Sequence, residues 1–126
     1  MIIKNLENSQ IVDFAGTEGI TKHIVIGHDN GSNEMVLRHF DLEPGAASPY
    51  HQHEYPHLVM VVSGVGALID ANKKSHPLSA GDYAYVNDDE IHQFKNTSNE
   101  AFKFICVVPP RGENQAIYNC SPSSKP

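Results

Sequence analysis

The chain has 126 residues and a mass of 13.9 kDa, which suits a single domain with a buried core. Hydrophobic residues make up 40% and charged residues 19%, so the composition is that of a globular protein rather than a disordered one. Fifteen Asp and Glu residues against nine Lys and Arg residues give a net charge of −6, which disfavours nucleic acid or an anionic membrane as a partner.

Neither a membrane span nor a secretory signal is expected. No apolar run approaches the ~20 residues that cross a bilayer, and the start MIIKNLENSQ lacks the basic flank and long apolar stretch of a signal peptide. The two cysteines, Cys106 and Cys120, are too few for a disulfide scaffold and have no CxxC spacing. Together these features predict a reducing, cytoplasmic location.

Short segments rich in Val, Ile, Phe and Tyr alternate with turn residues along the chain, which predicts an antiparallel sandwich or barrel. From the N-terminus, the expected strands are residues 22–26, 35–42, 57–62, 66–70, 83–86, 92–95 and 101–108. Residues 113–118 are expected to form at most a turn or two of helix, and the final SPSSKP to fray. We therefore expect one domain over residues 1–112 and a C-terminal tail, a short helix or disordered, over residues 113–126.

The first residues, Met1 to Ile3, are apolar and β-prone, as a strand that adds to a neighbouring sheet would be. Because an open sandwich leaves edge strands that need covering, we expect a homodimer. The alternative is that residues 1–3 close the sheet of their own chain.

Strand alternation predicts which side chains face the interior. In residues 101–108, placing Lys103 outside puts Phe104 and Cys106 inside. In residues 35–42, the mostly apolar even-numbered set includes Arg38. An inward arginine must be paired or line a polar cavity, because burying it alone is costly. The alternative is that a β-bulge shifts the alternation and leaves Arg38 in solvent.

Histidine is unusually concentrated, with eight in the chain and three between residues 51 and 57. His51 and His53 project to one face of an extended backbone, close enough to chelate one ion. His57 begins the next expected strand and can turn back to the same centre, while His92 comes from a distant strand. Neutral imidazoles suit divalent transition metals. For the HxH pair alone, two exposed strand histidines remain the alternative.

Two stretches that contain these histidines resemble the two motifs of the cupin superfamily. Residues 45–64, GAASPYHQHEYPHLVMVVSG, resemble the first: a Gly, five residues, HxH, three or four residues, Glu, six residues and Gly. Residues 81–96, GDYAYVNDDEIHQFKN, resemble the second: a Gly, five residues, PxG, two residues, His, three residues and Asn. The resemblance implies an all-β, single-domain cupin, a double-stranded β-helix or jelly-roll barrel, over most of residues 1–112. It also implies pairing into a dimer.

Three positions depart from the family pattern. His57 stands where the family usually has its glutamate ligand, and Asn87 and Asp89 replace the Pro and Gly of the second motif. Asn and Asp are turn formers, so we expect the turn to survive. The change from Glu to His resembles small single-domain bacterial cupins with a four-histidine manganese site. That resemblance implies one divalent metal per chain, manganese first and iron next, with nickel, zinc or copper possible. The implied ligands are His51, His53, His57 and His92.

Beside this metal, the inward alternation predicts a small, mostly apolar pocket. Phe94, Phe104 and Cys106 are expected to line it, with Arg38 as its cationic end. The alternative makes Cys106 a plain buried core residue, which is the commoner fate of a free cysteine. Glu54 lies between two of the ligands but alternates to the wrong face, so it is expected to stay off the metal. The remaining histidines are expected to be exposed: His23, His28, His39 and His76.

Two classes of function remain open. The first is a metal-dependent enzyme acting on a small organic substrate, with dioxygenase-like oxidoreductase chemistry preferred over isomerase or lyase chemistry. The second is a non-catalytic metal- or ligand-binding module that acts as a sensor or store. A nucleophilic hydrolase is disfavoured because the sequence has no GxSxG motif.

Overall fold

The computed structural model describes residues 1–12 and 17–113, and within them it is built from β-strands and three short 3-10 turns, with no α-helix. The expected helix over residues 113–118, apart from Glu113, and Cys120 lie outside the described residues. The strands are β1 (Gln10–Val12), β2 (Ile20–Ile26), β3 (Val36–Leu42), β4 (His57–Ser63), β5 (Val65–Ile69), β6 (Ser75–Ser79), β7 (Tyr83–Val86), β8 (Gln93–Lys95) and β9 (Phe102–Val108). The 3-10 turns are η1 (Leu6–Asn8), η2 (His28–Asn30) and η3 (Pro110–Gly112).

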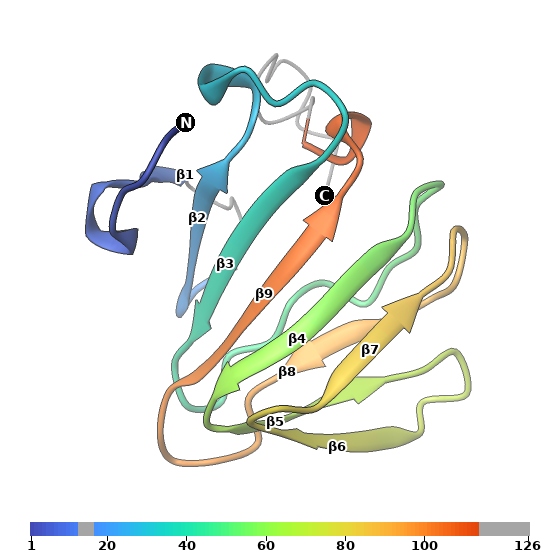
Figure 1. Ribbon diagram of the computed structural model, residues 1–126. Coiled ribbons are helices and arrows are strands. Elements are labelled where there is room, and N and C mark those ends of the chain that lie inside the picture. The colour runs from blue at the N-terminus through green and yellow to red at the C-terminus, as the bar shows by residue number, and fades with distance from the viewer. Residues whose placement is uncertain (13–16, 114–126) are drawn as a thin grey trace.

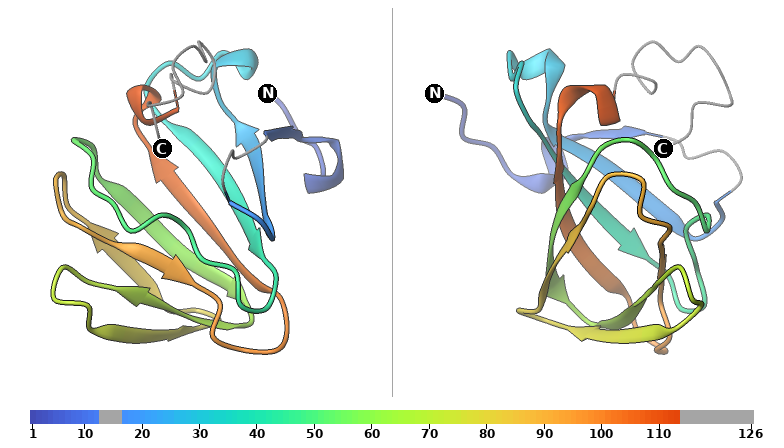
Figure 2. Two further views of the ribbon diagram at one scale, coloured as in Figure 1. Left: turned by 180° about the vertical axis from the view of Figure 1, so that it is seen from behind. Right: turned by 90° about the vertical axis from the view of Figure 1, so that its right-hand side faces the viewer.

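Two antiparallel sheets face each other and form a jelly-roll barrel, so the expected all-β fold is confirmed (Figures 1 and 2). The larger sheet has the strand order β1-β2-β3-β9-β4-β7, and the smaller has the order β6-β5-β8. Residues 47 and 51 bridge to residues 95 and 92, so this stretch runs antiparallel beside β8. No helix within the described ranges is long and apolar enough to cross a bilayer.

Two strands, β1 and β6, were not expected from the sequence. The β6 segment, SHPLS, contains Pro77, which lacks a backbone donor and breaks a typical strand pattern. Because β6 is at the edge of the smaller sheet, a proline is tolerated there. Met1, Ile2 and Ile3 are exposed and lie in no strand, so the alternative in which they close their own sheet is wrong. The edge strand beside β2 in the larger sheet is β1.

The expected alternation holds on β3 and β9. Phe104 and Cys106 are buried on β9, and Arg38 on β3 is only 2% exposed, so the solvated alternative for Arg38 is wrong. The rings of Phe40, Phe104 and Phe94 stack in series, with centroid separations of 5.1 and 4.5 Å. These stacked aromatic rings fill the space between the two sheets.

The prediction that His39 is exposed is wrong. His39 does face away from the barrel interior, but β3 lies in the middle of the larger sheet, between β2 and β9. Its direct neighbours on the adjacent strands are His23 and Ile105, and His39 is only 7% exposed. This burial lowers the pKa of His39. His23 is itself half-buried and hydrogen-bonds Ser9 Oγ through Nδ1 at 2.9 Å. His28 and His76 are exposed, as expected.

The turn before His92 survives the loss of the motif's Pro and Gly. Asp89, at the glycine position, adopts φ of 62°, a left-handed conformation that short polar residues tolerate better than most. Asn87 accepts a hydrogen bond from the Glu90 backbone N–H at 3.2 Å, and its own N–H donates to the Glu90 carboxylate at 2.9 Å. The reciprocal bonds close the turn and fix where His92 enters the barrel.

Candidate metal centre

Backbone pairing brings His51 and His92 together although 41 positions of sequence separate them. The His51 N–H donates to the His92 carbonyl at 3.1 Å, and the His92 N–H donates to the His51 carbonyl at 2.9 Å. His53 follows two residues after His51, and His57 is the first residue of β4. Three separate segments of the chain therefore deliver the four histidines to one place inside the barrel.

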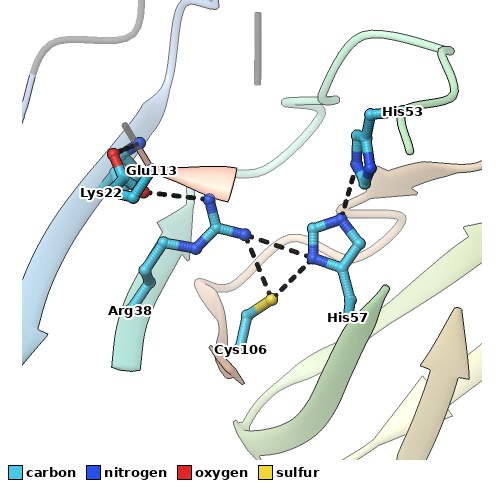
Figure 3. Close-up of polar contacts among 6 residues, drawn as sticks. All are labelled: Lys22, Arg38, His53, His57, Cys106 and Glu113. Carbon is cyan, nitrogen blue, oxygen red and sulfur yellow. Dashed lines mark hydrogen bonds and ion pairs between the residues drawn. The ribbon is translucent and has the colours of Figure 1, made fainter. Parts of the chain in front are cut away.

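The histidine nitrogens converge. One ring nitrogen each of His51, His53 and His92 lies within 4.8 Å of the other two, a spacing at which one ion can be held. His57 joins the group through His53, because their Nε2 atoms are 2.8 Å apart (Figure 3). The ring centroids of His57 and His92 are 5.1 Å apart.

Backbone carbonyls fix the orientation of two of these rings. His53 Nδ1 lies 3.0 Å from the Tyr55 carbonyl oxygen, and His92 Nδ1 lies 2.8 Å from the Glu90 carbonyl oxygen. A carbonyl only accepts, so in both rings Nδ1 carries the proton and Nε2 keeps its lone pair. The Tyr55 ring also stacks on His53, with centroids 3.8 Å apart and an interplanar angle of 8°. Outer contacts of this kind hold metal ligands in a fixed tautomer and orientation.

Burial keeps His53, His57 and His92 uncharged near neutral pH. It lowers the pKa of His53 to about 4, with the neighbouring His92 adding to the effect. Burial is also the main cause that lowers the pKa of His57 and of His92, and the positive charge of Arg38 contributes to both shifts. Metal ligation requires neutral imidazole, so these three rings are in the correct protonation state without help from the ion.

His57 makes a different outer contact, with Arg38 on β3 and Cys106 on β9 (Figure 3). Its Nδ1 lies 3.2 Å from an Arg38 terminal nitrogen and 2.9 Å from Cys106 Sγ. Arginine only donates, so the hydrogen bond from Arg38 requires a His57 Nδ1 without a proton. In that tautomer the proton is on His57 Nε2 and points to His53. A ring that binds a metal through Nε2 carries its proton on Nδ1 instead, and Cys106 Sγ is then the available acceptor.

Cys106 is thus both buried and in polar contact. It is 1% exposed, and burial raises the pKa of its thiol even though Arg38 works in the opposite direction. Arg38 donates to Cys106 Sγ at 3.3 Å. The two alternatives for Cys106, core residue and pocket residue, therefore describe the same position.

A buried ion cluster behind the histidines was not expected from the sequence. Glu113, only 1% exposed, accepts from Lys22 Nζ at 2.7 Å and from Arg38 at 3.1 Å (Figure 3). Lys22 shares the inward alternation of Ile24 on β2, and that signal was readable in the sequence. Glu113 lies after the last strand, so strand alternation could not predict that it is buried. Arg38 is therefore paired with Glu113 and is not the open cationic end that the sequence predicted.

A narrow cavity of about 30 Å³ lies beside the histidines. Arg38, Phe94, Phe104 and Cys106 all line it. The full lining is Ile20, Arg38, Phe40, Leu42, Ser48, Pro49, His51, His57, His92, Phe94, Phe104 and Cys106. Most of these side chains are apolar, and the free space among them suits one or two water molecules or one end of a small ligand. Glu54 is exposed and pairs with Arg111 at 2.9 Å, away from this cavity, as expected.

The histidines fit a transition metal ion. Two ligands bound at ~2.1 Å and at right angles lie about 3 Å apart, close to the observed separation of the His53 and His57 nitrogens. Neutral nitrogen donors are also the ligands that divalent transition metals accept. The fold and the site together define a small β-barrel with a cluster of histidines, spaced as metal ligands can be, beside an apolar interior cavity.

The chain belongs to the cupin domain family, whose model matches residues 38–108, more than half of the chain. It is 27% identical, over 89 residues, to 1-methylthio-D-xylulose 5-phosphate methylsulfurylase of Rhodospirillum rubrum, covering 71% of this chain and 55% of that protein. It is 24% identical, over 120 residues, to auxin-binding protein 1 of Arabidopsis thaliana, covering 86% of this chain and 60% of that protein. The chain thus spans less than two thirds of the length of both relatives.

Solved structures share the fold at low sequence identity. The polyketide cyclase RemF from Streptomyces resistomycificus superposes with a TM-score of 0.80 at 22% identity, covering 86% of this chain and 79% of that one. A protein described as a predicted oxalate decarboxylase from Thermotoga maritima gives 0.74 at 21% identity, covering 86% and 99%. Proteins with this fold therefore include very different described activities, and the fold alone selects none of them.

Proposed function

We propose that this cupin holds one divalent transition metal per chain on His51, His53, His57 and His92, next to a pocket for a small organic ligand. The observation that supports the proposal is the convergence of one ring nitrogen each of His51, His53 and His92, with His57 Nε2 2.8 Å from His53 Nε2. Backbone carbonyls fix the tautomers of His53 and His92. The resemblance to small four-histidine cupins favours manganese, followed by iron.

The proposed activity is oxidoreductase chemistry of the dioxygenase type on a small, mainly apolar substrate. When bound, a divalent metal supplies a Lewis acid at the wall of the pocket. The chain's own residues would do the rest. Phe94 and Phe104 would exclude water and contact the apolar part of the substrate. Cys106, which accepts a hydrogen bond from Arg38, would also accept from His57 Nδ1–H and so hold that ring in its metal-binding orientation.

The second candidate is a binding protein without turnover, and the saturation of the polar groups in the pocket favours it. Arg38 is already bonded to Glu113 and Cys106, and Cys106 to Arg38 and His57. Neither residue is left free to move a proton for a substrate. An enzyme of the first kind must therefore obtain its acid–base chemistry from the histidines or from the ligand itself.

Metal analysis of untagged protein, with anomalous scattering across several absorption edges, tests the metal site. We expect about one metal per chain in the wild type and in the control His76→Ala, whose exposed histidine pairs with Asp70. We expect an occupancy well below one in His92→Ala. Full occupancy in His92→Ala would overturn the ligand assignment.

A substrate screen separates the two candidate functions. Dicarbonyls, phenols and alkenes would be tested with O₂ or peroxide, using manganese- and iron-loaded protein and His53→Ala as the metal-site control. The enzyme proposal expects turnover that His53→Ala abolishes. Saturable ligand binding without turnover under any metal would favour the binding protein, and activity that persists in His53→Ala would contradict the proposed centre.

A further inference from the structure

The 3-10 turn η3 and the residue after it contact the neighbours of two histidines of the metal centre. The Gly112 N–H donates to the Pro109 carbonyl and the Glu113 N–H donates to the Pro110 carbonyl, both at 2.9 Å. These two bonds close the turn and fix Gly112 and Glu113 relative to the end of β9. Both residues are buried, although no strand contains them.

Gly112 lies directly against the Tyr55 ring, which stacks on His53 with a centroid separation of 3.8 Å. A Cβ atom at position 112 would lie only 2.6 Å from a Tyr55 ring carbon, so a residue other than glycine would displace the ring or the turn. The Tyr55 hydroxyl is buried and has no hydrogen-bond partner among the described residues. Packing, against Gly112 as well as His53, therefore determines where this ring lies.

Glu113 reaches a different histidine through Arg38. One carboxylate oxygen accepts from Arg38 Nη1 at 3.1 Å, and the other accepts from Lys22 at 2.7 Å (Figure 3). The second terminal nitrogen of Arg38, Nη2, donates to Cys106 Sγ at 3.3 Å. Cys106 Sγ in turn lies 2.9 Å from His57 Nδ1. The carboxylate thus orients the guanidinium, and the guanidinium orients the sulfur that faces His57.

We propose that Gly112 and Glu113 are positioning residues for the metal centre. Gly112 acts on His53 through Tyr55, and Glu113 acts on His57 through Arg38 and Cys106. The inference rests on the proposed metal site and extends it to residues that touch no ligand and lie beyond the matched residues 38–108. Outer partners of metal ligands commonly change metal affinity by about 10- to 100-fold.

The test is the affinity for manganese(II), measured by competition titration with a chelator. Gly112→Ala should weaken binding about tenfold, because the added methyl group moves Tyr55. Glu113→Gln should weaken it by a similar factor, because an amide offers one acceptor oxygen where the carboxylate offers one to each cation. Circular dichroism and urea unfolding show that each variant is folded during the titration.

The matched control is Arg111→Ala, in the same turn. Arg111 pairs with Glu54 at 2.9 Å, but both side chains are more than half exposed. Exposed pairs contribute little, so the affinity should change less than about twofold. Wild-type affinity in both Gly112→Ala and Glu113→Gln would overturn the inference and leave the proposed metal site intact.

Double variants distinguish positioning from a general loosening of the fold. If Gly112 acts through Tyr55, Gly112→Ala should add little to the effect of Tyr55→Leu. If Glu113 acts through Cys106, Glu113→Gln should add little to the effect of Cys106→Ala. A further tenfold loss in both double variants would contradict the two routes, because each route is already interrupted in the background variant.

Nitrogen-15 NMR of the imidazole rings in metal-free protein separates this inference from the proposed function. A wild type that binds no metal would defeat the proposed function, and the spectra would still decide the positioning. Gly112→Ala should shift the ring signals of His53, and Glu113→Gln should shift those of His57. The exposed His76 should keep its signals in both variants. Unchanged His53 and His57 signals would overturn the inference.

Discussion

Replacing Glu113 with Ala removes the carboxylate that pairs with both buried cations, Lys22 and Arg38. Both cationic side chains are at most 4% exposed, so water cannot replace the lost partner. Breaking a buried ion pair from one side costs about 3–5 kcal/mol, because the remaining charge stays buried without compensation. For a domain of this size, that loss lowers the melting temperature by about 10–20 °C.

The matched control is Glu54→Ala, which breaks the ion pair with Arg111. That pair is 2.9 Å long, like the buried ones, but its side chains are 67 and 51% exposed. Exposed pairs contribute about 1 kcal/mol or less. Urea unfolding of both variants and of the wild type, without metal, gives the two changes in free energy. Equal changes of less than about 1 kcal/mol in both variants would refute the reasoning, because burial would then make no difference.

Three further predictions concern the histidine cluster. Tyr55→Leu removes the ring stacked on His53 and should weaken metal binding about tenfold in a competition titration with a chelator; unchanged affinity would remove Tyr55 from the site. Cys106→Ala removes the acceptor for His57 Nδ1 and should weaken metal binding by a similar factor, whereas Cys106→Ser should retain more of it. Because the pKa of His53 is lowered to about 4 while an unfolded histidine titrates near 6.5, the unfolded chain takes up protons first as the pH falls. The free energy of unfolding of metal-free protein should therefore fall by about 1–2 kcal/mol between pH 6.5 and 4, allowing for the half-exposed ring. The variant His53→Asn should show a smaller pH dependence of this free energy. An identical pH dependence in His53→Asn would contradict the lowered pKa of His53.

The sequence by itself determined which side chains of β3 and β9 face the interior. In a strand, alternate residues point to opposite sides, so this is a local property that needs no knowledge of the neighbours. Arg38 and Cys106 could be assigned to the interior on this basis. The two histidine motifs are also local patterns, and the backbone bridge between residues 51 and 92 shows that they meet inside one barrel.

Only the tertiary structure decided how much of each face is covered. His39 alternates outward as expected, yet it is buried because β3 has a neighbouring strand on both sides. Pro77 interrupts a strand pattern in the sequence, yet β6 forms because it lies at a sheet edge. A strand's position in its sheet depends on pairings between distant segments, and no short stretch of sequence contains that information.

The buried ion cluster is the clearest case of this dependence. Lys22 and Glu113 are 91 positions apart, and their contact exists only because η3 turns back at the end of β9 and places Glu113 over Arg38. In the sequence, Glu113 is one acidic residue of 15 acidic side chains, and acidic side chains are usually solvated. It is buried because two buried cations require a counter-charge, and that requirement arises only after β2, β3 and β9 have packed side by side.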